Sequence, residues 1–173
     1  MAGSRRLTAL SGHVVARVQH HLPEGPLVIA LSGGADSAVC GWAAGQIGST
    51  VRAIHIDHGW PASAILLSAA TDIAGHLEFP LVVIEAQARS GSSPEGQARL
   101  ARYEALESEL APGEWLLTGH TMDDQAETVL GNLLRGAGAV GLTGIPRRRG
   151  NIVRPLLDVS RSETRELATL LRL

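Results

Sequence analysis

Short apolar runs alternate along this chain with longer segments in which apolar residues repeat at helical spacing. The short runs have the length of buried strands and span residues 27–31, 51–56, 81–85 and 115–118. The longer segments predict helices over residues 36–48, 62–77, 94–110 and 122–135. Five apolar residues between Leu7 and Val18 predict an amphipathic helix before the first strand, and a last helix is expected after Ser160, running to Leu173.

The alternation of strands and helices is typical of βαβ units. Strands that are apolar on both faces are typical of a parallel sheet covered by helices on both sides. The sequence therefore predicts an α/β fold, a doubly wound parallel sheet flanked by helices, in one domain of ordinary size. The glycine-rich stretch from Arg135 to Gly150 predicts a long loop. Because no stop signal follows the last helical pattern, the chain is expected to end within that helix.

Composition restricts the function classes and the compartment. All 15 basic residues are arginine and the formal net charge is −2. The chain as a whole therefore carries no positive field of the kind that indicates nucleic-acid binding, and any such contact must be local. The single cysteine, Cys40, cannot form an internal disulfide, which favours a reducing, cytoplasmic location. No run of 18 apolar residues exists, so neither a signal peptide nor a membrane span is expected.

The turn after the first predicted strand has the composition of a phosphate cradle. It consists of Ser32, Gly33, Gly34, Ala35, Asp36 and Ser37. Glycines let backbone N–H groups approach phosphate oxygens, and the following helix directs its partial positive end to the same place. A carboxylate here is compatible with phosphate through a bridging Mg²⁺, and the absence of lysine excludes a Walker A loop. The alternative is a tight turn in which Asp36 is an ordinary helix N-cap.

Histidines follow the second strand, at what should be the same edge of the sheet. Residues 55–59 read His-Ile-Asp-His-Gly. A nucleotide contact is one interpretation, because ligands of open parallel sheets bind at the carboxyl ends of strands. A metal site formed by His55, His58 and His120 is a second, although the spacing is a poor zinc pattern. Histidines that only cap the strand ends are the third.

The segment after the fourth strand places acidic residues at the start of a helix. Asp124, Glu127 and Thr128 fall on one helical face, where a second Mg²⁺ ligand would lie. The opposite face is apolar and is expected to turn toward the core; it contains Met122, Ala126, Val129, Leu130 and Leu133. The alternative for the acids is helix capping that the helix dipole favours.

Two groups of arginines are candidate substrate contacts. Arg99 and Arg102 share a face with Tyr103 in the helix predicted over 94–110, which is also the usual pattern of a solvated helix face. Arg154 and the run at 147–149 could hold phosphate, or could belong to a flexible solvated loop.

Taken in order, these motifs resemble the tRNA(Ile)-lysidine synthase family, whose first motif is the PP-loop of ATP pyrophosphatases. The resemblance covers nearly the whole chain and rests on Ser32–Ser37, His55–Gly59, Glu95–Tyr103, His120–Thr128, Leu134–Gly144 and Arg154–Leu157. Trp60 and Pro61 depart from the leucine-arginine pair usual in the family. Family members continue into C-terminal tRNA-binding domains, so residues 1–173 are expected to be a single ATP-binding catalytic domain that is truncated before them.

The resemblance implies a ligase reaction. ATP adenylates the C2 carbonyl oxygen of the wobble cytidine in tRNA(Ile) with a CAU anticodon, and pyrophosphate leaves. Free L-lysine then displaces AMP and gives lysidine. The expected cofactors are ATP and Mg²⁺. No membrane partner is expected, and a homodimer is left open.

The resemblance also implies roles for single residues. Asp36, Asp124 and His120 are expected to be catalytic, with Asp36 and Asp124 as the Mg²⁺ ligands. The proton acceptor for lysine is expected to be Asp124 or His120. ATP contacts are expected from Ser32, Gly33, Gly34, Ala35, Asp36, Ser37, Ile56, His58 and Gly119. Substrate or tRNA contacts are expected from Arg99, Arg102, Tyr103, Glu127, Thr128 and Arg135.

Two other functions compete with this one. Other PP-loop enzymes thiolate tRNA, but they typically use paired cysteines, and this chain has one. A nucleotide-binding module without catalysis, resembling universal stress proteins, would explain the fold and the glycines. It would not explain the acidic motif from His120 to Thr128, and it should release no pyrophosphate from ATP.

Overall fold

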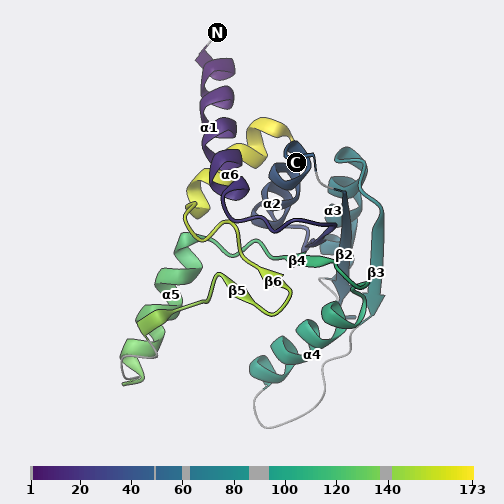
Figure 1. Ribbon diagram of the computed structural model, residues 1–173, viewed down its shortest axis with the longest axis vertical. Coiled ribbons are helices and arrows are strands. Elements are labelled where there is room, and N and C mark those ends of the chain that lie inside the picture. Colours follow the sequence, from purple (N-terminus) through teal and green to yellow (C-terminus); the bar gives the residue numbers. More distant parts are fainter. Residues whose placement is uncertain (1, 49, 60–62, 86–93, 137–141) are drawn as a thin grey trace.

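The sheet has six strands in the order β3-β2-β1-β4-β6-β5 (Figure 1). The computed structural model describes residues 2–48, 50–59, 63–85, 94–136 and 142–173, without the side chains of residues 2, 94–99 and 101. The strands are β1 (Leu27–Ala30), β2 (Val51–Asp57), β3 (Leu81–Glu85), β4 (Trp115–Leu117), β5 (Arg148–Arg149) and β6 (Ile152–Val153). The helices are α1 (Ala2–Gln19), α2 (Ala35–Gln46), α3 (Ser63–His76), α4 (Pro94–Ser108), α5 (Met122–Leu134) and α6 (Arg161–Leu171).

The predicted fold class is confirmed. The strands from β3 through β6 pair in parallel, and Leu27 of β1 lies opposite both Val51 of β2 and Trp115 of β4. This register brings the carboxyl ends of β1, β2 and β4 to one edge. The four strands and the four helices between and after them that apolar periodicity predicted lie within two residues of their expected ends.

Strands that are apolar on both faces supply two separate cores. Leu27 and Ile29 of β1 point into a cluster with residues of α1, α2, α3 and α6. Val28, between them, points to the other face and packs with Tyr103 and Leu106 of α4. Helices therefore cover both faces of the sheet. None of the helices among the described residues is both long and apolar enough to cross a membrane.

Two predictions about local structure are wrong. The stretch from Arg135 to Gly150 contains β5, which pairs antiparallel with β6 around a tight turn at Gly150, whose φ is 57°. Strands of two residues are too short to give a periodic signal. The last helix does not continue to Leu173, because Arg172 adopts a left-handed conformation and caps α6.

The predicted packing of α5 is also wrong. No residue of this helix is buried, and its apolar face is exposed; the exposed fractions are 49% for Met122, 57% for Leu130 and 55% for Leu133. Amphipathic periodicity was a correct signal for the helix, but it does not say what the apolar face contacts. The core therefore does not set the position of α5, and contacts at its first turns must do so.

Candidate active site

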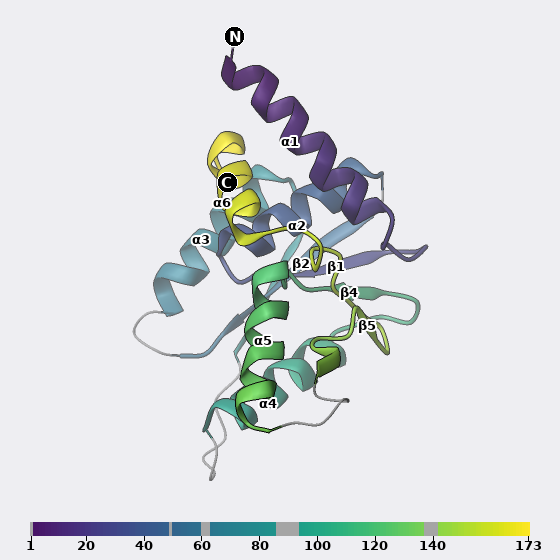
Figure 2. The same cartoon turned by 90° about the vertical axis from the view of Figure 1, so that its left-hand side faces the viewer.

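Three segments meet at the carboxyl edge of the parallel strands. They are the loop from Ser32 to the start of α2, the loop from Thr118 to the start of α5, and the first turn of α6. Figure 2 shows α5 beginning beside the sheet and extending away from it. The residues of interest on α5 therefore lie in its first two turns.

The loop after β1 is shaped by its glycines and closed by two hydroxyls. Gly33 has a φ of 85°, and a Cβ at this position would lie 2.5 Å from the carbonyl oxygen of Leu66. The hydroxyl of Ser37 donates to the carbonyl of Gly34 at 2.9 Å and accepts the N–H of Ser32 at 3.1 Å. The loop is thus held in one shape from within.

The start of α2 carries no side-chain cap. Its N-cap is Gly34, so the alternative in which Asp36 is the N-cap is wrong. The orphan N–H groups in the first turn of a helix bind anions readily. Gly119 packs directly against this turn, since a Cβ there would lie 2.8 Å from the backbone of Asp36 and Ser37. Only a residue without a side chain therefore fits at position 119, beside the start of α2.

Asp36 points away from its own helix and toward α6. Its Oδ1 accepts a hydrogen bond from the hydroxyl of Thr164, which is fully buried. Burial raises the pKa of Asp36, and the negative charge of Asp124 raises it further, while the Thr164 hydroxyl and the charge of Arg161 oppose the shift. The negative charge of Asp124 is therefore felt at Asp36, and both carboxylates contact the first turn of α6.

Asp124 is hydrogen-bonded through both carboxylate oxygens. Its Oδ2 accepts the N–H of Thr121 at 2.7 Å and the hydroxyl at 2.8 Å, and its Oδ1 pairs with Arg161 at 2.8 Å. Burial alone would raise the pKa of Asp124, but the bonds from Thr121 and Arg161 outweigh it and lower the pKa. The capping alternative is thus confirmed for this residue, and the carboxylate is ionised at neutral pH.

The histidines do not form a metal site in the described part of the chain, where no three His, Cys, Asp or Glu residues cluster. His55 is buried, with its Nδ1 2.8 Å from the carbonyl oxygen of Leu31. His120 is half-buried, with its Nδ1 2.9 Å from the Thr118 hydroxyl. His58 lies half-buried after β2. The zinc alternative is therefore not supported.

Comparison with known proteins identifies the family of the chain. The model of the PP-loop domain family matches residues 8–173. The chain belongs to the PP-loop domain family. It is 45% identical over 168 residues to the tRNA(Ile)-lysidine synthase of Salinispora tropica, and 43% identical over 176 residues to that of Salinispora arenicola. These alignments cover 88% and 92% of this chain but 50% and 52% of the relatives, so the chain spans about half the length of the curated relatives it matches.

A solved structure supports the fold. The NMN synthetase of Francisella tularensis matches with a TM-score of 0.60 over 99% of this chain and 71% of that one, at 19% sequence identity. The likeness shows that the PP-loop sheet and its helices are shared.

The residues of the PP-loop edge fit ATP and a divalent cation. The glycine loop and the start of α2, which lacks a side-chain cap, offer backbone donors to phosphate. Asp36 and Asp124 supply hard oxygen ligands, the type that Mg²⁺ prefers. Asp36 Oδ2 accepts no hydrogen bond among the described residues, and it is available to a cation.

Three of the six predicted substrate residues make contacts away from the two carboxylates. Tyr103 is 4% exposed and belongs to the core under α4. Arg102 lies half-buried beside its ring. Arg135 ends α5 at the far end from the sheet, about 20 Å along the helix from its start, and its guanidinium pairs with Asn132. Arg99 belongs to α4, but its side chain lies outside the described residues, as do Trp60 and Pro61.

Of the remaining candidates, Glu127 and Thr128 on α5 lie near the site, and Ile56 lies in the core. Glu127 is exposed and pairs with Arg161 at 2.8 Å, and Thr128 is half-buried one residue on. Ile56, near the end of β2, is 9% exposed. Their contacts with ATP or tRNA stay predictions.

The arginines at 147–154 do not form a flexible solvated loop. Arg154 is 2% exposed and donates to the carbonyl of Pro146 at 2.7 Å. Arg147 pairs with Asp158 at 2.8 Å. Arg148 and Arg149 make up β5, and the Arg148 guanidinium stacks 4.0 Å from the ring of Trp115. These arginines serve packing and pairing at the sheet edge formed by β5 and β6.

Sequence reasoning missed Arg161 and Thr164, which contact the two catalytic candidates Asp124 and Asp36. The Ser160–Glu163 capping box could have located the start of α6 in the sequence. It could not have revealed that this start lies against the PP-loop.

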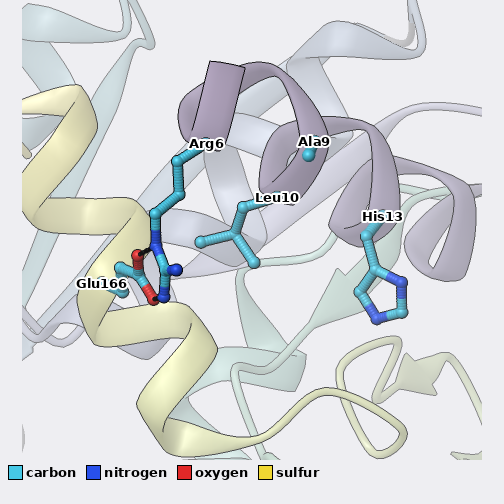
Figure 3. A pocket seen from close by; sticks show the side chains of 5 residues that line it. All are labelled: Arg6, Ala9, Leu10, His13 and Glu166. Atoms are coloured by element: carbon cyan, nitrogen blue, oxygen red, sulfur yellow. Dashed lines mark hydrogen bonds and ion pairs between the residues drawn. The ribbon is translucent and has the colours of Figure 1, made fainter. Parts of the chain in front are cut away.

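A shallow hollow of about 250 Å³ lies elsewhere, between α1 and α6 (Figure 3). Arg6 and Glu166 face each other across one side of it as an ion pair, and His13 lies at the other side. It contains none of the predicted site residues. The chemistry is therefore expected at the PP-loop edge and not in this hollow.

Proposed function

We propose that the chain is the ATP-activating part of a tRNA(Ile)-lysidine synthase. The reaction joins lysine to C2 of the wobble cytidine of tRNA(Ile) through an adenylated intermediate, and it releases AMP and pyrophosphate. The observation that carries the proposal is the start of α2: a helix end with a glycine N-cap, beside two carboxylates, Asp36 and Asp124, that both contact the first turn of α6. The relatives named as lysidine synthases support the choice of substrate.

The residues divide the work according to their chemistry. Backbone N–H groups of the PP-loop bind the ATP phosphates and stabilise the charge that develops on pyrophosphate. Asp36 and Asp124 would hold Mg²⁺, which would supply Lewis-acid stabilisation of the charge on the departing group. The lysine amine must lose a proton before it attacks, because its pKa in water is about 10.4. Asp124, ionised at neutral pH, and His120 are the candidate acceptors.

The thiolation alternative loses support from the single cysteine. Cys40 is buried, and burial together with the charge of Asp36 raises the pKa of its thiol to about 12. A buried thiol that stays protonated is neither a nucleophile nor a sulfur carrier. A tRNA-thiolating enzyme of this family would have to use a sulfur carrier other than Cys40.

Tracing the label of ATP tests the proposal. With ATP labelled at the α phosphate, isoleucine tRNA, lysine and a protein completed at its C-terminus, the expected labelled product is AMP, with an equal amount of pyrophosphate and with lysidine in the tRNA. Asp36→Asn should lower the rate by at least about 100-fold. Asp72→Asn, on the exposed face of α3, is the matched control and should not change it. Labelled ADP, or no pyrophosphate release, would overturn the proposal.

A further inference from the structure

The first turn of α6 contacts both groups of carboxylates at the PP-loop edge. The hydroxyl of Thr164 donates to Asp36 Oδ1. The Arg161 guanidinium donates from Nη2 to Asp124 Oδ1 and from Nη1 to Glu127 Oε1, each at 2.8 Å. One turn of helix thus joins the PP-loop aspartate to the acids of α5.

This turn is a rigid platform. Ser160 and Glu163 form a capping box. Glu163 Oε2 accepts the Ser160 hydroxyl at 2.6 Å and the Ser160 backbone N–H at 2.8 Å. Thr164 is fully buried, and Leu167 anchors the next turn in the core. Side chains that project from this turn therefore have a fixed origin.

The helix α5, in contrast, depends on polar contacts for its position. It buries no residue. Near its start, the N–H of Met122 donates to the carbonyl of Val159 at 2.9 Å, and Asp123 accepts the backbone N–H of Arg161 at 2.8 Å. The guanidinium of Arg161 adds two ion pairs to the same helix. Arg161 is therefore a principal tether of Asp124 to the rest of the site.

We propose that Arg161 and Thr164 are positioning residues that set the separation of Asp36 and Asp124 for a divalent cation carried by ATP. The inference rests on the proposed function, since it assumes that these carboxylates meet Mg²⁺·ATP. Two carboxylates repel each other, so their separation needs a brace. The planar fork of Arg161 fixes Asp124 by bridging it to Glu127, which a lysine ammonium cannot do with the same geometry, and Thr164 fixes Asp36 from the same turn.

The test is calorimetric binding of ATP to the 173-residue chain, once with Mg²⁺ and once with EDTA. The ratio of the two affinities measures the contribution of the cation. In Arg161→Gln and in Thr164→Val this ratio should fall by about 10-fold or more, which is typical when residues that orient metal ligands are lost. ATP affinity in EDTA should not change. Thr164→Ser keeps the hydroxyl and should restore the ratio, whereas Arg161→Lys should not.

Matched controls lie on the same helix. Arg165 is exposed, and its charge also reaches Asp36, but it forms no ion pair with a described carboxylate. Arg165→Gln therefore tests charge without contact, and Thr169→Val tests a hydroxyl that bonds only within the helix. Both variants should keep the ratio of the unsubstituted chain.

The outcomes separate the inference from the proposed function. If Arg161→Gln and Thr164→Val keep the full Mg²⁺ contribution, or if Arg165→Gln loses as much, the positioning role is wrong while ATP binding stands. If the unsubstituted chain binds no ATP, or binds it equally without Mg²⁺, the proposed function is wrong and the inference falls with it. Should Arg161→Gln fail to fold by circular dichroism, the Thr164→Val and Thr164→Ser pair decides.

Discussion

The starts of α2 and α6 lie side by side at the PP-loop edge but are built in opposite ways. The start of α6 is complete in itself: Ser160 accepts the N–H of Glu163, and the Glu163 carboxylate returns to Ser160. The start of α2 has Gly34 as its N-cap and no side-chain cap. A helix end that its own chain leaves without a cap is available to an anion from outside.

The position of the acidic residue explains the difference. In α6 the carboxylate stands three residues after the N-cap, as Glu163, and in α5 Asp124 takes the same place. In α2 that place belongs to Ser37, and the carboxylate comes one residue earlier, as Asp36. From there it turns to Thr164 instead of back to Gly34. The shift of one position leaves Asp36 outside any capping box, whereas Asp124 belongs to one.

The largest expected effect comes from filling the space that shapes the start of α2. Gly33→Ala should lower the free energy of unfolding by about 4 kcal/mol, because it combines a left-handed backbone with a backbone clash. Gly113→Ala is the matched control: its φ of 87° is nearly that of Gly33, but a Cβ there meets no atom within 4 Å. Gly113→Ala should lower the free energy of unfolding by about 1 kcal/mol. Urea unfolding measures both, and equal losses would show that the contact with Leu66 is unimportant.

Most of the fold around these helix starts was predictable from the sequence. Buried parallel strands read as short apolar runs and amphipathic helices follow a period, and the parallel topology must bring the turns after β1 and β4 to one edge. The apolar face of α5 was misjudged, because periodicity shows that a helix has such a face and not what covers it. The strand β5 was missed, because two residues carry no period.

The candidate site was predictable only in part, for a different physical reason. The PP-loop and Asp124 lie in short sequence motifs, whose residue types and spacing are enough to indicate them. Thr164 meets Asp36 from 128 positions away, and nothing in the residue type or spacing marks that contact. Residues that orient a ligand from another element are ordinary in sequence, and only the packing of α6 reveals them.

A side-chain cap at the N-cap of α2 should make this helix start resemble that of α6, whose N-cap is Ser160. Gly34 has ordinary extended backbone, and a Cβ would lie 3.6 Å from the Ser32 hydroxyl, so Asp fits. Gly34→Asp should stabilise the free chain by a few tenths of a kcal/mol. It should also weaken ATP binding by about 100-fold, because like charges placed together cost several kcal/mol. Gly34→Ser supplies a cap without charge and should bind ATP more tightly than Gly34→Asp; calorimetry that shows equal binding would contradict anion binding here.

The smallest effect is expected at α6, where removal of the cap should lower stability and leave ATP affinity in EDTA unchanged. Ser160→Ala should cost about 1 kcal/mol at pH 7. The Ser160 hydroxyl is the main reason that the pKa of Glu163 is lowered, with further contributions from His13 and Arg17. A lowered pKa stabilises the folded state above the unfolded value, about 4.3, and that contribution is lost as the pH falls through the folded value.

The difference in unfolding free energy between the unsubstituted chain and Ser160→Ala should therefore be largest at pH 7. It should shrink as the pH falls below about 4.3, which urea unfolding at pH 7 and at lower pH would measure. Ser108→Ala, at an exposed hydroxyl that bonds only to the Ala105 carbonyl, is the control and should show no such pH dependence. A constant difference would mean that Glu163 is not part of the cap. A loss of ATP affinity in EDTA in Ser160→Ala would mean that the cap of α6 also supports the phosphate-binding start of α2.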